Sequence, residues 1–444
     1  MTTHPHDTGA AGSSTAASTA ASAAVDESAS VPPSLIDANL AATPGEYVSS
    51  WLRRVRSGDA GNLPVVAGLV LIVLIFESQN GNFLTAANFA NLLQQMPYLV
   101  LFGMAEVFVL LLGEIDLSAG FNAACGASIT LILNGQLHNW PWWGSMLAGF
   151  AFCAVMGLIQ GLLITRLAIP SFVVTLAGLL GLEGVLLVIL NQFAGKQTGG
   201  TVAMNNHILF DIENGLVTPA AGWIITIALI VVFAAYTLVR DSRRRRANLV
   251  TAPLGVQLAK IVGVAIVGVA VVVICNMNRG RTVPIRGVPT VVYLLLAIVV
   301  ITTFVLTRTR FGRYVYAVGG NAEAARRAGI RVNRIRVACF TLTGLMAGVT
   351  GLFYASYTQS MSTAVDGGQL VLYAVAAAVI GGTSLFGGRG KMVHAVLGGL
   401  VIATITNGMG LLNIGAAGQY MITALVLLFA AGVDAVARRG RVAA

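Results

Sequence analysis

The residues most suited to a chemical or mechanical role lie in a basic segment at 308–336, set between two apolar stretches. Asn321 to Gly329 has the pattern of a short helix, because Asn is a favourable N-cap and Gly a favourable residue just past a helix end. Glu323 suits the positive start of such a helix. A charged segment of this length is too long to be a simple connection. We interpret it as a docking surface for another protein, with an ordinary positively charged loop as the alternative.

Acidic side chains inside apolar sequence form a second set of candidates. Glu106 and Glu183 lie well within apolar stretches, where a carboxylate is costly and usually faces protein or water. Glu114, Asp116 and Ser118 lie where two apolar stretches meet, and Asp116 or Ser118 suits a helix cap there. This break predicts a discontinuous span, a feature that often lines transport paths. The alternatives are helix-packing carboxyl groups and a short solvated turn.

A third set of candidates consists of amide and carboxylate side chains close to the ends of late apolar stretches. Gln359 and Asp366 belong to polar sequence at 354–369, and Asn407 lies near the last loop on the same side. Such groups would suit weak binding of a hydroxylated solute at the mouth of a path. A solvated loop is the alternative.

Patterns typical of enzymes and metal sites are missing from the sequence. A phosphate-binding loop needs Gly-x-x-x-x-Gly-Lys-Ser/Thr, and the nearest match, Gly390-Lys391, continues with Met392. No His, Cys and carboxylate cluster has metal-ligand spacing, and the four scattered cysteines are interpreted as small buried hydrophobes. We therefore expect no catalytic residue, no metal, no cofactor and no ATP hydrolysis by this chain.

Composition places these candidates in an all-α, polytopic membrane protein. Of the 444 residues, 56% are hydrophobic and only 10% are charged, whereas soluble domains carry about 25% charged residues. The net charge of +10 does not indicate nucleic-acid binding, because the basic residues lie in short loops between apolar stretches. The Ala-, Ser- and Thr-rich residues 1–45 predict a disordered cytoplasmic tail, and 46–444 the transmembrane domain.

Twelve apolar stretches predict about twelve membrane-spanning helices. With the N-terminus in the cytoplasm, 23 of the 27 Lys and Arg residues fall on or near the cytoplasmic side. This bias predicts that both termini are cytoplasmic. The stretches are 62–79, 97–113, 117–135, 143–165, 170–192, 221–240, 255–276, 288–307, 337–356, 369–386, 392–412 and 418–436.

Glycine patterns indicate close helix packing and one broken span. Gly157 and Gly161, and likewise Gly344 and Gly348, have the four-residue spacing that lets helices approach closely. The glycines of AVIGGTSLFGGRG at 378–390 predict a bend or re-entrant turn near the cytoplasmic face. Tight packing and a mobile gate are both open interpretations of that turn.

Four ordered motifs resemble the ribose/xylose family of monosaccharide permeases, which belong to ATP-driven (ABC) importers. They are YAVGGNAEAARRAGI at 316–330, GEIDLSAG at 113–120, PSFVVTLAGLLG at 170–181 and AVIGGTSLFGGRG at 378–390. Glu-Ala-Ala followed by Gly resembles the family's coupling motif. The span count is more similar to the xylose type, with an extra pair at about 221–276. Glu183 departs from the family pattern, in which this position is often Arg.

The resemblance implies a homodimer in the cell (plasma or inner) membrane, served by a separate ATP-binding subunit and an extracytoplasmic sugar-binding protein. It implies that Asn321, Glu323, Ala324, Ala325, Arg326 and Gly329 couple the chain to the ATPase. The expected activity is import of a monosaccharide, such as the pentose xylose, by alternating access. The alternatives are an ion-coupled transporter centred on Glu106 and Glu183, an ABC permease for a non-sugar solute such as a branched-chain amino acid, and a membrane-embedded enzyme.

Overall fold

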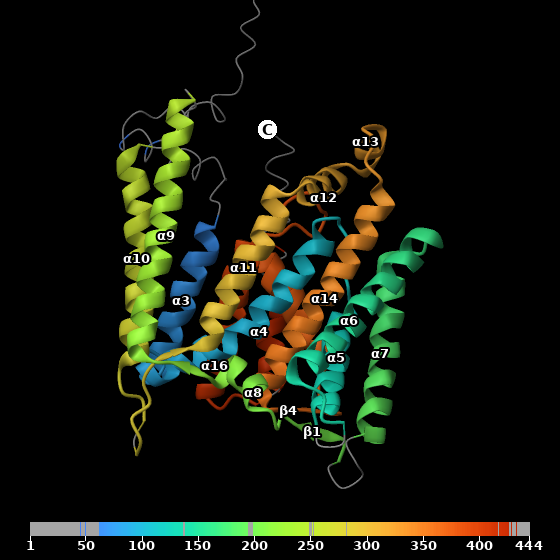
Figure 1. The fold of residues 1–444 in the computed structure, drawn as a ribbon, viewed down its shortest axis with the longest axis horizontal. Coiled ribbons are helices and arrows are strands. Elements are labelled where there is room, and N and C mark those ends of the chain that lie inside the picture. The colour runs from blue at the N-terminus through green and yellow to red at the C-terminus, as the bar shows by residue number, and fades with distance from the viewer. Residues whose placement is uncertain are drawn as a thin grey trace, which may run out of the picture.

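The computed structural model describes residues 62–135, 138–193, 199–247, 253–280, 282–415 and 417–425, with the single residues 45, 49, 251, 428 and 432. Over this part of the chain the protein is a bundle of helices with two short strand pairs (Figure 1). Apart from residue 45, the predicted tail at 1–45 lies outside the described residues, and its structure stays a prediction.

Eight described helices are long and apolar enough to cross a membrane. They are α4 (Ala86–Leu110), α6 (Trp142–Arg166), α7 (Ser171–Phe193), α9 (Pro219–Arg246), α10 (Leu254–Asn276), α11 (Thr290–Arg308), α14 (Val332–Thr358) and α16 (Met392–Leu411). Three shorter apolar helices are α3 (Leu63–Gln79), α5 (Ala119–Asn134) and α15 (Gly367–Ile380). The helical, polytopic class is therefore as predicted, whereas twelve crossings and cytoplasmic termini stay predictions.

The first eleven predicted stretches each coincide with one of these helices. The largest difference is at α4, which begins at Ala86 rather than at 97. The added part contains four carboxamide side chains, Asn88, Asn91, Gln94 and Gln95, which lower its hydropathy and hide it from the search for apolar stretches. Thr85 caps it by accepting a hydrogen bond from the Asn88 amide (3.4 Å), and Pro97 lies inside the helix.

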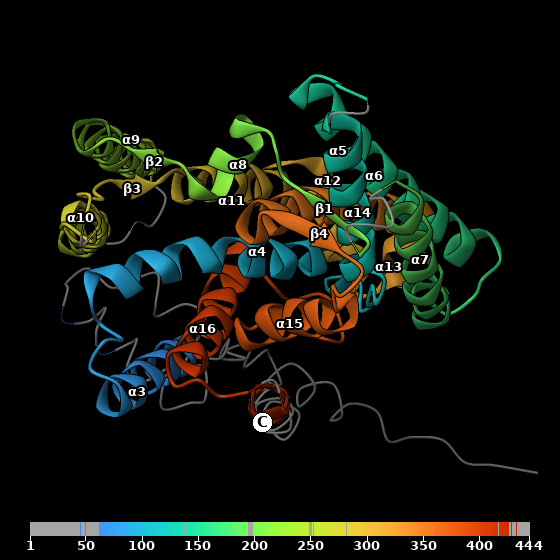
Figure 2. The ribbon, with the colours of Figure 1, turned by 90° about the horizontal axis from the view of Figure 1, so that it is seen from below.

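The central helix of the bundle is α4, which α5, α11, α14, α15 and α16 surround (Figure 2). Its residues 99–110 are all buried and, apart from Glu106, apolar or glycine; most of them form one core with the facing sides of α14, α15 and α16. A helix that is apolar on every side is stable only when it is buried on every side. The interior position of α4 therefore follows from its sequence.

The predicted glycine pairs lie in one helix–helix contact. A β-carbon at Gly157 or Gly161 of α6 would meet the backbone of α14 at Phe340 or Val337. Conversely, a β-carbon at Gly344 of α14 would meet the Cys153 carbonyl of α6. The prediction that these glycines allow close packing is confirmed, since the two backbones leave no room for side chains.

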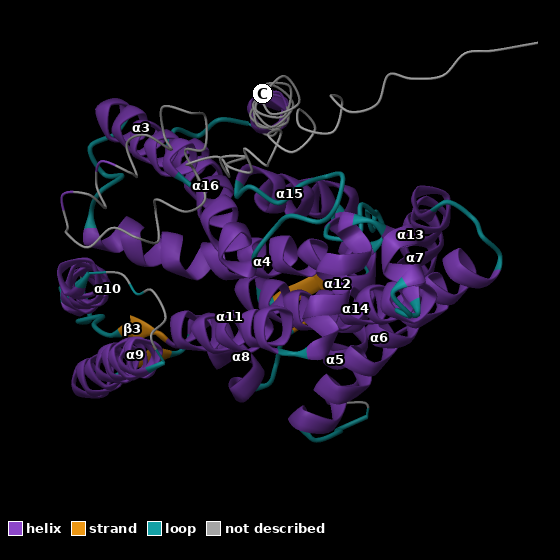
Figure 3. Cartoon of the chain, turned by 90° about the horizontal axis from the view of Figure 1, so that it is seen from above, coloured by secondary structure: helices purple, strands orange, loops and turns teal. Residues whose placement is uncertain are grey.

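The pair α9 and α10 forms a hairpin at one side of the bundle (Figure 3). Strand β2 (Leu216–Val217) precedes the hairpin and pairs antiparallel with β3 (Val288–Pro289), which follows it. The Thr290 amide donates to the Gly215 carbonyl at 2.9 Å. The chain therefore leaves the bundle and returns to it at adjacent backbone atoms, and the hairpin corresponds to the extra pair predicted at about 221–276.

The two ends of the bundle differ in composition (Figure 1). One end, the basic end, carries α12 (Arg310–Gly320), α13 (Ala322–Arg327) and the last turn of α9, Arg243 to Arg246. The opposite end carries α8 (His207–Asn214) and both strand pairs, including β1 (Thr201–Ala203) with β4 (Ser360–Ser362).

Candidate functional site

The predicted short helix of the basic segment is α13. Asn321 caps it by accepting a hydrogen bond from the Ala324 amide (2.9 Å). Glu323 pairs with Arg326 at 2.7 Å and with Arg327 at 3.4 Å, both on the exposed surface. Exposed pairs of this kind stabilise a helix only weakly, so their main effect is to order the charged surface.

Gly329 ends α13 in a left-handed conformation with a φ of 83°. Its amide donates to the Arg326 carbonyl and the Ile330 amide donates to the Ala325 carbonyl, both at 3.0 Å. These two bonds are the pairing of a Schellman C-cap. The predicted boundaries of the helix are thus confirmed, while its role in docking stays a prediction.

One side chain of the predicted coupling set anchors α13 to the bundle. Ala325 is buried against Val318 of α12 and Val332 of α14. Asn321, Glu323, Ala324, Arg326 and Gly329 are exposed in this single chain. The helix therefore presents its polar face outward while its apolar side connects it to two longer helices.

The turn between α15 and α16 joins α12 to the end of α4. The Gly388 amide donates to the Leu111 carbonyl at 2.8 Å, and the Tyr316 hydroxyl donates to the Gly390 carbonyl at 2.7 Å. A β-carbon at Gly319 would collide with the Leu111 carbonyl. The predicted break of the span at 378–390 is confirmed, and the backbones of α12, the turn and α4 lie in direct contact.

The predicted break lies between α4 and α5, and its residues Glu114, Asp116 and Ser118 are buried, so the solvated turn given as the alternative is not found. Asp116 Oδ1 accepts hydrogen bonds from the Ser118 amide (2.9 Å) and hydroxyl (2.6 Å). Gln160 of α6 donates to the Ser118 hydroxyl at 2.7 Å. Glu106 is fully buried next to these residues, and its Oε2 accepts from the Asp116 amide at 3.5 Å.

Glu114 has a different partner from the other carboxylates of the break. It pairs with Arg336 near the start of α14, with 2.9 Å between Arg Nε and Glu Oε1. Only 10% of the Glu114 side chain is exposed, and a buried carboxylate needs a compensating charge. The pair therefore fixes the break to the helix that follows the coupling segment.

The opposite end of the bundle contains a polar pocket of about 300 Å³, within the lower range of small-molecule sites. Three helices supply its lining: Asn88, Asn91, Gln94 and Gln95 of α4, Tyr357 of α14, and Thr406, Asn407, Gly410 and Leu411 of α16. The Asn88 amide donates to Asn407 Oδ1 at 2.8 Å. No lining residue carries a formal charge, so the pocket suits a neutral solute with many hydrogen-bonding groups.

Tyrosine rings continue from the pocket toward the core. Tyr98 lies 5.3 Å, centroid to centroid, from both Tyr354 and Tyr357. On α15, the Gln369 amide donates to the Tyr373 hydroxyl at 2.7 Å. Tyrosine combines an apolar ring with a polar tip, and Tyr357 brings both to the lining of the pocket.

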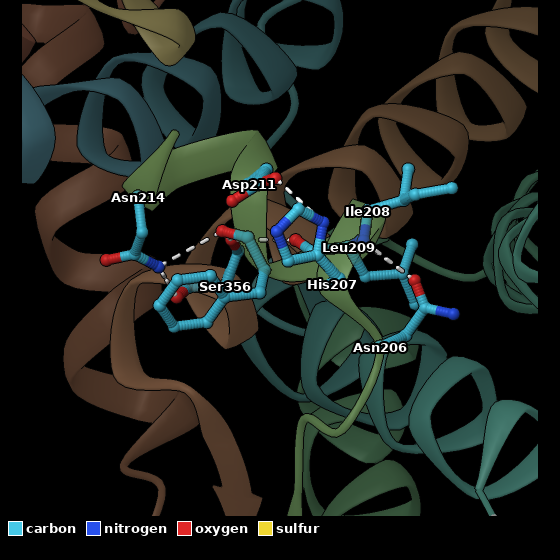
Figure 4. Close-up of polar contacts among 8 residues, drawn as sticks. Asn206, His207, Ile208, Leu209, Asp211, Asn214 and Ser356 are labelled. Atoms are coloured by element: carbon cyan, nitrogen blue, oxygen red, sulfur yellow. Dashed lines mark hydrogen bonds and ion pairs between the residues drawn. The ribbon is translucent and has the colours of Figure 1, made fainter. Parts of the chain in front are cut away.

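The short helix α8 lies beside the pocket and rests on α14 (Figure 4). Asn206 caps it by accepting from the Ile208 amide (2.9 Å) and the Leu209 amide (3.2 Å). The Ser356 hydroxyl of α14 donates to the Leu209 carbonyl at 2.9 Å, and the Asn214 amide donates to the Ser356 carbonyl at 2.8 Å. A single serine thus receives most of the polar contacts that dock this helix.

Comparison with known proteins identifies the family. Residues 88–431 match the family described as "Branched-chain amino acid transport system / permease component". The chain belongs to this permease family. It is 32% identical to the xylose transport system permease protein of Escherichia coli K12, covering 84% of this chain and 92% of that protein. The ribose import permease proteins of E. coli K12 and Bacillus subtilis 168 are 28% and 30% identical, covering 87% and 83% of this chain and 95% and 90% of theirs. No solved structure matches.

The permease structure separates the residues predicted for the path. Asn407 lines the pocket, whereas Asp116 and Ser118 lie in the break, with Glu106 of α4 next to them. Gln359 is exposed, and its carbonyl accepts from the Met204 amide at 2.9 Å. These placements locate the residues without testing their roles.

Two further predicted path residues, Asp366 and Glu183, belong neither to the pocket lining nor to the break. Asp366 caps α15 by accepting from the Gln369 amide at 2.8 Å, and its other oxygen accepts from the Tyr420 hydroxyl at 3.4 Å. Glu183 is half-buried on α7 and is not among the residues that line the polar pocket.

Sequence reasoning missed the pocket side of α4. Asn88, Asn91 and Gln95 recur at intervals of three and four residues, which places them on one face of a helix. That spacing was available in the sequence, but the segment lies outside the apolar stretch predicted at 97–113. Recognising this polar face requires the helix to begin before Pro97, at Ala86.

Proposed function

We propose that this permease is the membrane-spanning subunit of an ATP-driven importer for a monosaccharide, with a pentose such as xylose as the expected cargo. The observation that carries the proposal is the uncharged pocket of carboxamide, hydroxyl and tyrosine groups. A free amino acid carries two charges, and burying unpaired charges is costly. The pocket therefore favours a sugar over the amino-acid cargo in the family's description, in agreement with the xylose and ribose relatives.

The proposed topology has twelve crossings with the basic end in the cytoplasm. The described helices supply eight long and three shorter apolar segments, and a twelfth would begin with the helix at 417–425. The Arg-rich turn of α9 and the arginines of 308–336 lie at one end, which supports a cytoplasmic assignment for that end. The polar pocket then opens toward the outside.

The proposed drive for transport is a separate ATP-binding subunit that docks on α13. Its contacts would be Asn321, Glu323, Ala324, Arg326 and Gly329, with Ala325 as the internal anchor. Displacement of α13 would pass to α12, and from there to α4 through the backbone contacts at Gly319, Leu111 and Gly388. Because α4 also lines the pocket, this chain of contacts relates the cytoplasmic surface to the cargo site.

Alternating access in this proposal requires three partners in addition to the lipid bilayer. A sugar-binding protein delivers cargo from outside, a second copy of the permease completes the membrane unit, and the ATP-binding subunits change the conformation from inside. Path residues would include Asn407 and the carboxamides of α4, with Gln359 and Asp366 at the outer mouth. The other predicted path residues would have a structural role next to the path and no direct contact with the sugar. They are Glu106, Glu114, Asp116, Ser118 and Glu183.

The test is uptake of radiolabelled pentoses and hexoses into proteoliposomes that contain the permease, its ATP-binding subunit and the binding protein. We expect uptake that requires ATP and that falls when Asn91 is replaced by Leu. Gly68→Leu is a matched control, because a β-carbon at Gly68 would meet no atom of the described residues within 4 Å. Uptake that ignores ATP, follows an ion gradient and is lost in Glu106→Gln would instead support the ion-coupled alternative, which the buried, partly unpartnered Glu106 favours.

A further inference from the structure

Glu213 is a carboxyl group that the transport mechanism above does not use. It lies near the end of α8 and is fully buried. Neither of its carboxyl oxygens has a hydrogen-bond partner among the described residues. A buried ionised carboxylate without a partner is strongly disfavoured, and burial raises the pKa of Glu213 well above its ordinary value.

The backbone around Glu213 is held only by neutral groups. Its amide donates to the Ser356 hydroxyl at 3.1 Å, and its carbonyl accepts from the Gln94 side chain at 3.4 Å. Gln94 and Tyr357 both line the polar pocket, and Tyr357 lies within electrostatic reach of the Glu213 carboxyl. The helix that carries Glu213 thus shares a wall with the pocket.

These contacts define the docked position of α8, in which Glu213 is buried and its protonated form is favoured over the ionised form. An undocked position would differ from it in the surroundings of Glu213. If α8 leaves Ser356, Glu213 reaches water, where a carboxyl group ionises above about pH 4.3. Departure of α8 also breaks the contact to Gln94 and uncovers that side of the pocket.

We propose that α8 is a proton-linked outer lid of the sugar path, with Glu213 as its switch. The lid is docked when Glu213 is uncharged and opens with ionisation of Glu213, so the proton leaves to external water. This inference rests on the proposed function for the meaning of the path. The movement of α8 itself requires neither cargo nor ATP and can be tested separately.

The sign of the pH dependence follows from the raised pKa of docked Glu213. Both positions are protonated below about pH 4.3, so pH has no effect there. Between that value and the docked pKa, only the open position loses its proton. The open fraction therefore rises with pH, by up to about tenfold per pH unit.

The other titratable groups around α8 are few. They are the tyrosines Tyr354 and Tyr357 of α14, Tyr98 of α4 and Tyr293 of α11. On α8 itself, His207 and Asp211 form an exposed pair at 3.1 Å (Figure 4). Because His207 lies on the proposed lid and is paired with a carboxylate, it needs a control variant.

The experiment measures how fast a membrane-impermeant maleimide modifies a cysteine on α8 of the full-length permease between pH 5 and 8. Leu209→Cys replaces a fully buried residue and reports opening, whereas Ile208→Cys replaces one that is 48% exposed and reports the intrinsic reactivity of a thiol at each pH. The ratio of the two rates cancels the pH dependence of the thiol. The four native cysteines are buried, so the unsubstituted chain gives the background.

We expect the ratio to rise with pH in the parent chain and in His207→Asn, and to be flat in Glu213→Gln. A flat ratio in the parent chain, a slope that persists in Glu213→Gln, or a slope that His207→Asn removes would each overturn the proposal. If Leu209→Cys does not fold, hydrogen exchange of the α8 amides in the unsubstituted chain, corrected for intrinsic exchange, gives the same comparison. Loss of sugar uptake alone would refute the proposed function and leave the lid result standing.

Discussion

Substitution of Gly329 tests the coupling surface most directly. Its φ of 83° lies in the left-handed region, and within the described part of the chain a β-carbon added there would meet no atom within 4 Å. A side chain at this position is therefore opposed by backbone conformation and not by lack of space. For an ordinary residue the left-handed conformation costs about 1–2 kcal/mol, which lowers the population of the native turn roughly 5- to 30-fold.

Two variants separate the conformational effect from added volume. Gly329→Asn adds a side chain that adopts the left-handed region comparatively easily, while Gly329→Val adds a β-branched side chain that does not. Both side chains project into the same open space. We expect Val to lower ATP-driven sugar uptake by about fivefold or more and Asn to lower it less, with equal amounts of both variants in the membrane.

The assay compares ATP-driven uptake with stimulation of the ATPase by the permease in the same proteoliposomes. An uncoupled variant retains ATP hydrolysis or membrane insertion but not uptake. Parent-level uptake by Gly329→Val would refute the role of this turn in coupling. Equal losses in both variants would refute the conformational argument and assign the effect to steric exclusion of the partner.

Three further substitutions probe the pocket, the helix packing and the break. Asn407→Leu removes a neutral hydrogen-bonding group worth about 0.5–1.5 kcal/mol, so we expect the KM for sugar to rise by up to about tenfold, and an unchanged KM would contradict the site. Gly157→Leu places a side chain against the α14 backbone, so we expect a lower thermal midpoint, whereas Gly68→Leu has open space and should match the parent. Arg336→Gln leaves the Glu114 carboxylate without its ion pair, so we expect the free energy of unfolding to fall by roughly 1–3 kcal/mol. Adding Glu114→Gln should restore that stability. A double variant that is as unstable as Arg336→Gln alone would argue against the pair.

Much of the helical order was predictable because membrane helices must be apolar over their length. The same logic predicted the break at Glu114, since the closely spaced polar residues from Glu114 to Ser118 interrupt the apolar sequence. Local chemistry likewise predicted the Asn321 cap and the Gly329 end of α13, because caps depend on residues only a few positions apart. The glycine spacings predicted close packing but not that α6 and α14 are the partners.

The pocket was not predictable by these arguments, because its walls come from α4, α14 and α16. Asn407 was recognised as a polar residue near a span end, but its neighbour Asn88 lies far away in the sequence and in a segment that hydropathy does not mark. The helix α8 is only 8 residues long, and a helix so short is stable mainly through tertiary contacts. No sequence pattern around Ser356 predicts that this residue holds α8 against α14.

The strand pair at the base of the α9–α10 hairpin makes residues 216–289 an insertion whose two ends lie next to each other. Since Gly215 and Thr290 are already joined by a hydrogen bond, the continuity of the bundle does not depend on what lies between them. A chain that joined α8 directly to α11 would lose the packing of Val272, Cys275 and Val288 on Leu93 of α4, but none of the residues that line the pocket. The hairpin is accordingly a position where length and sequence can change, or a reporter domain can be attached, with little consequence for the path.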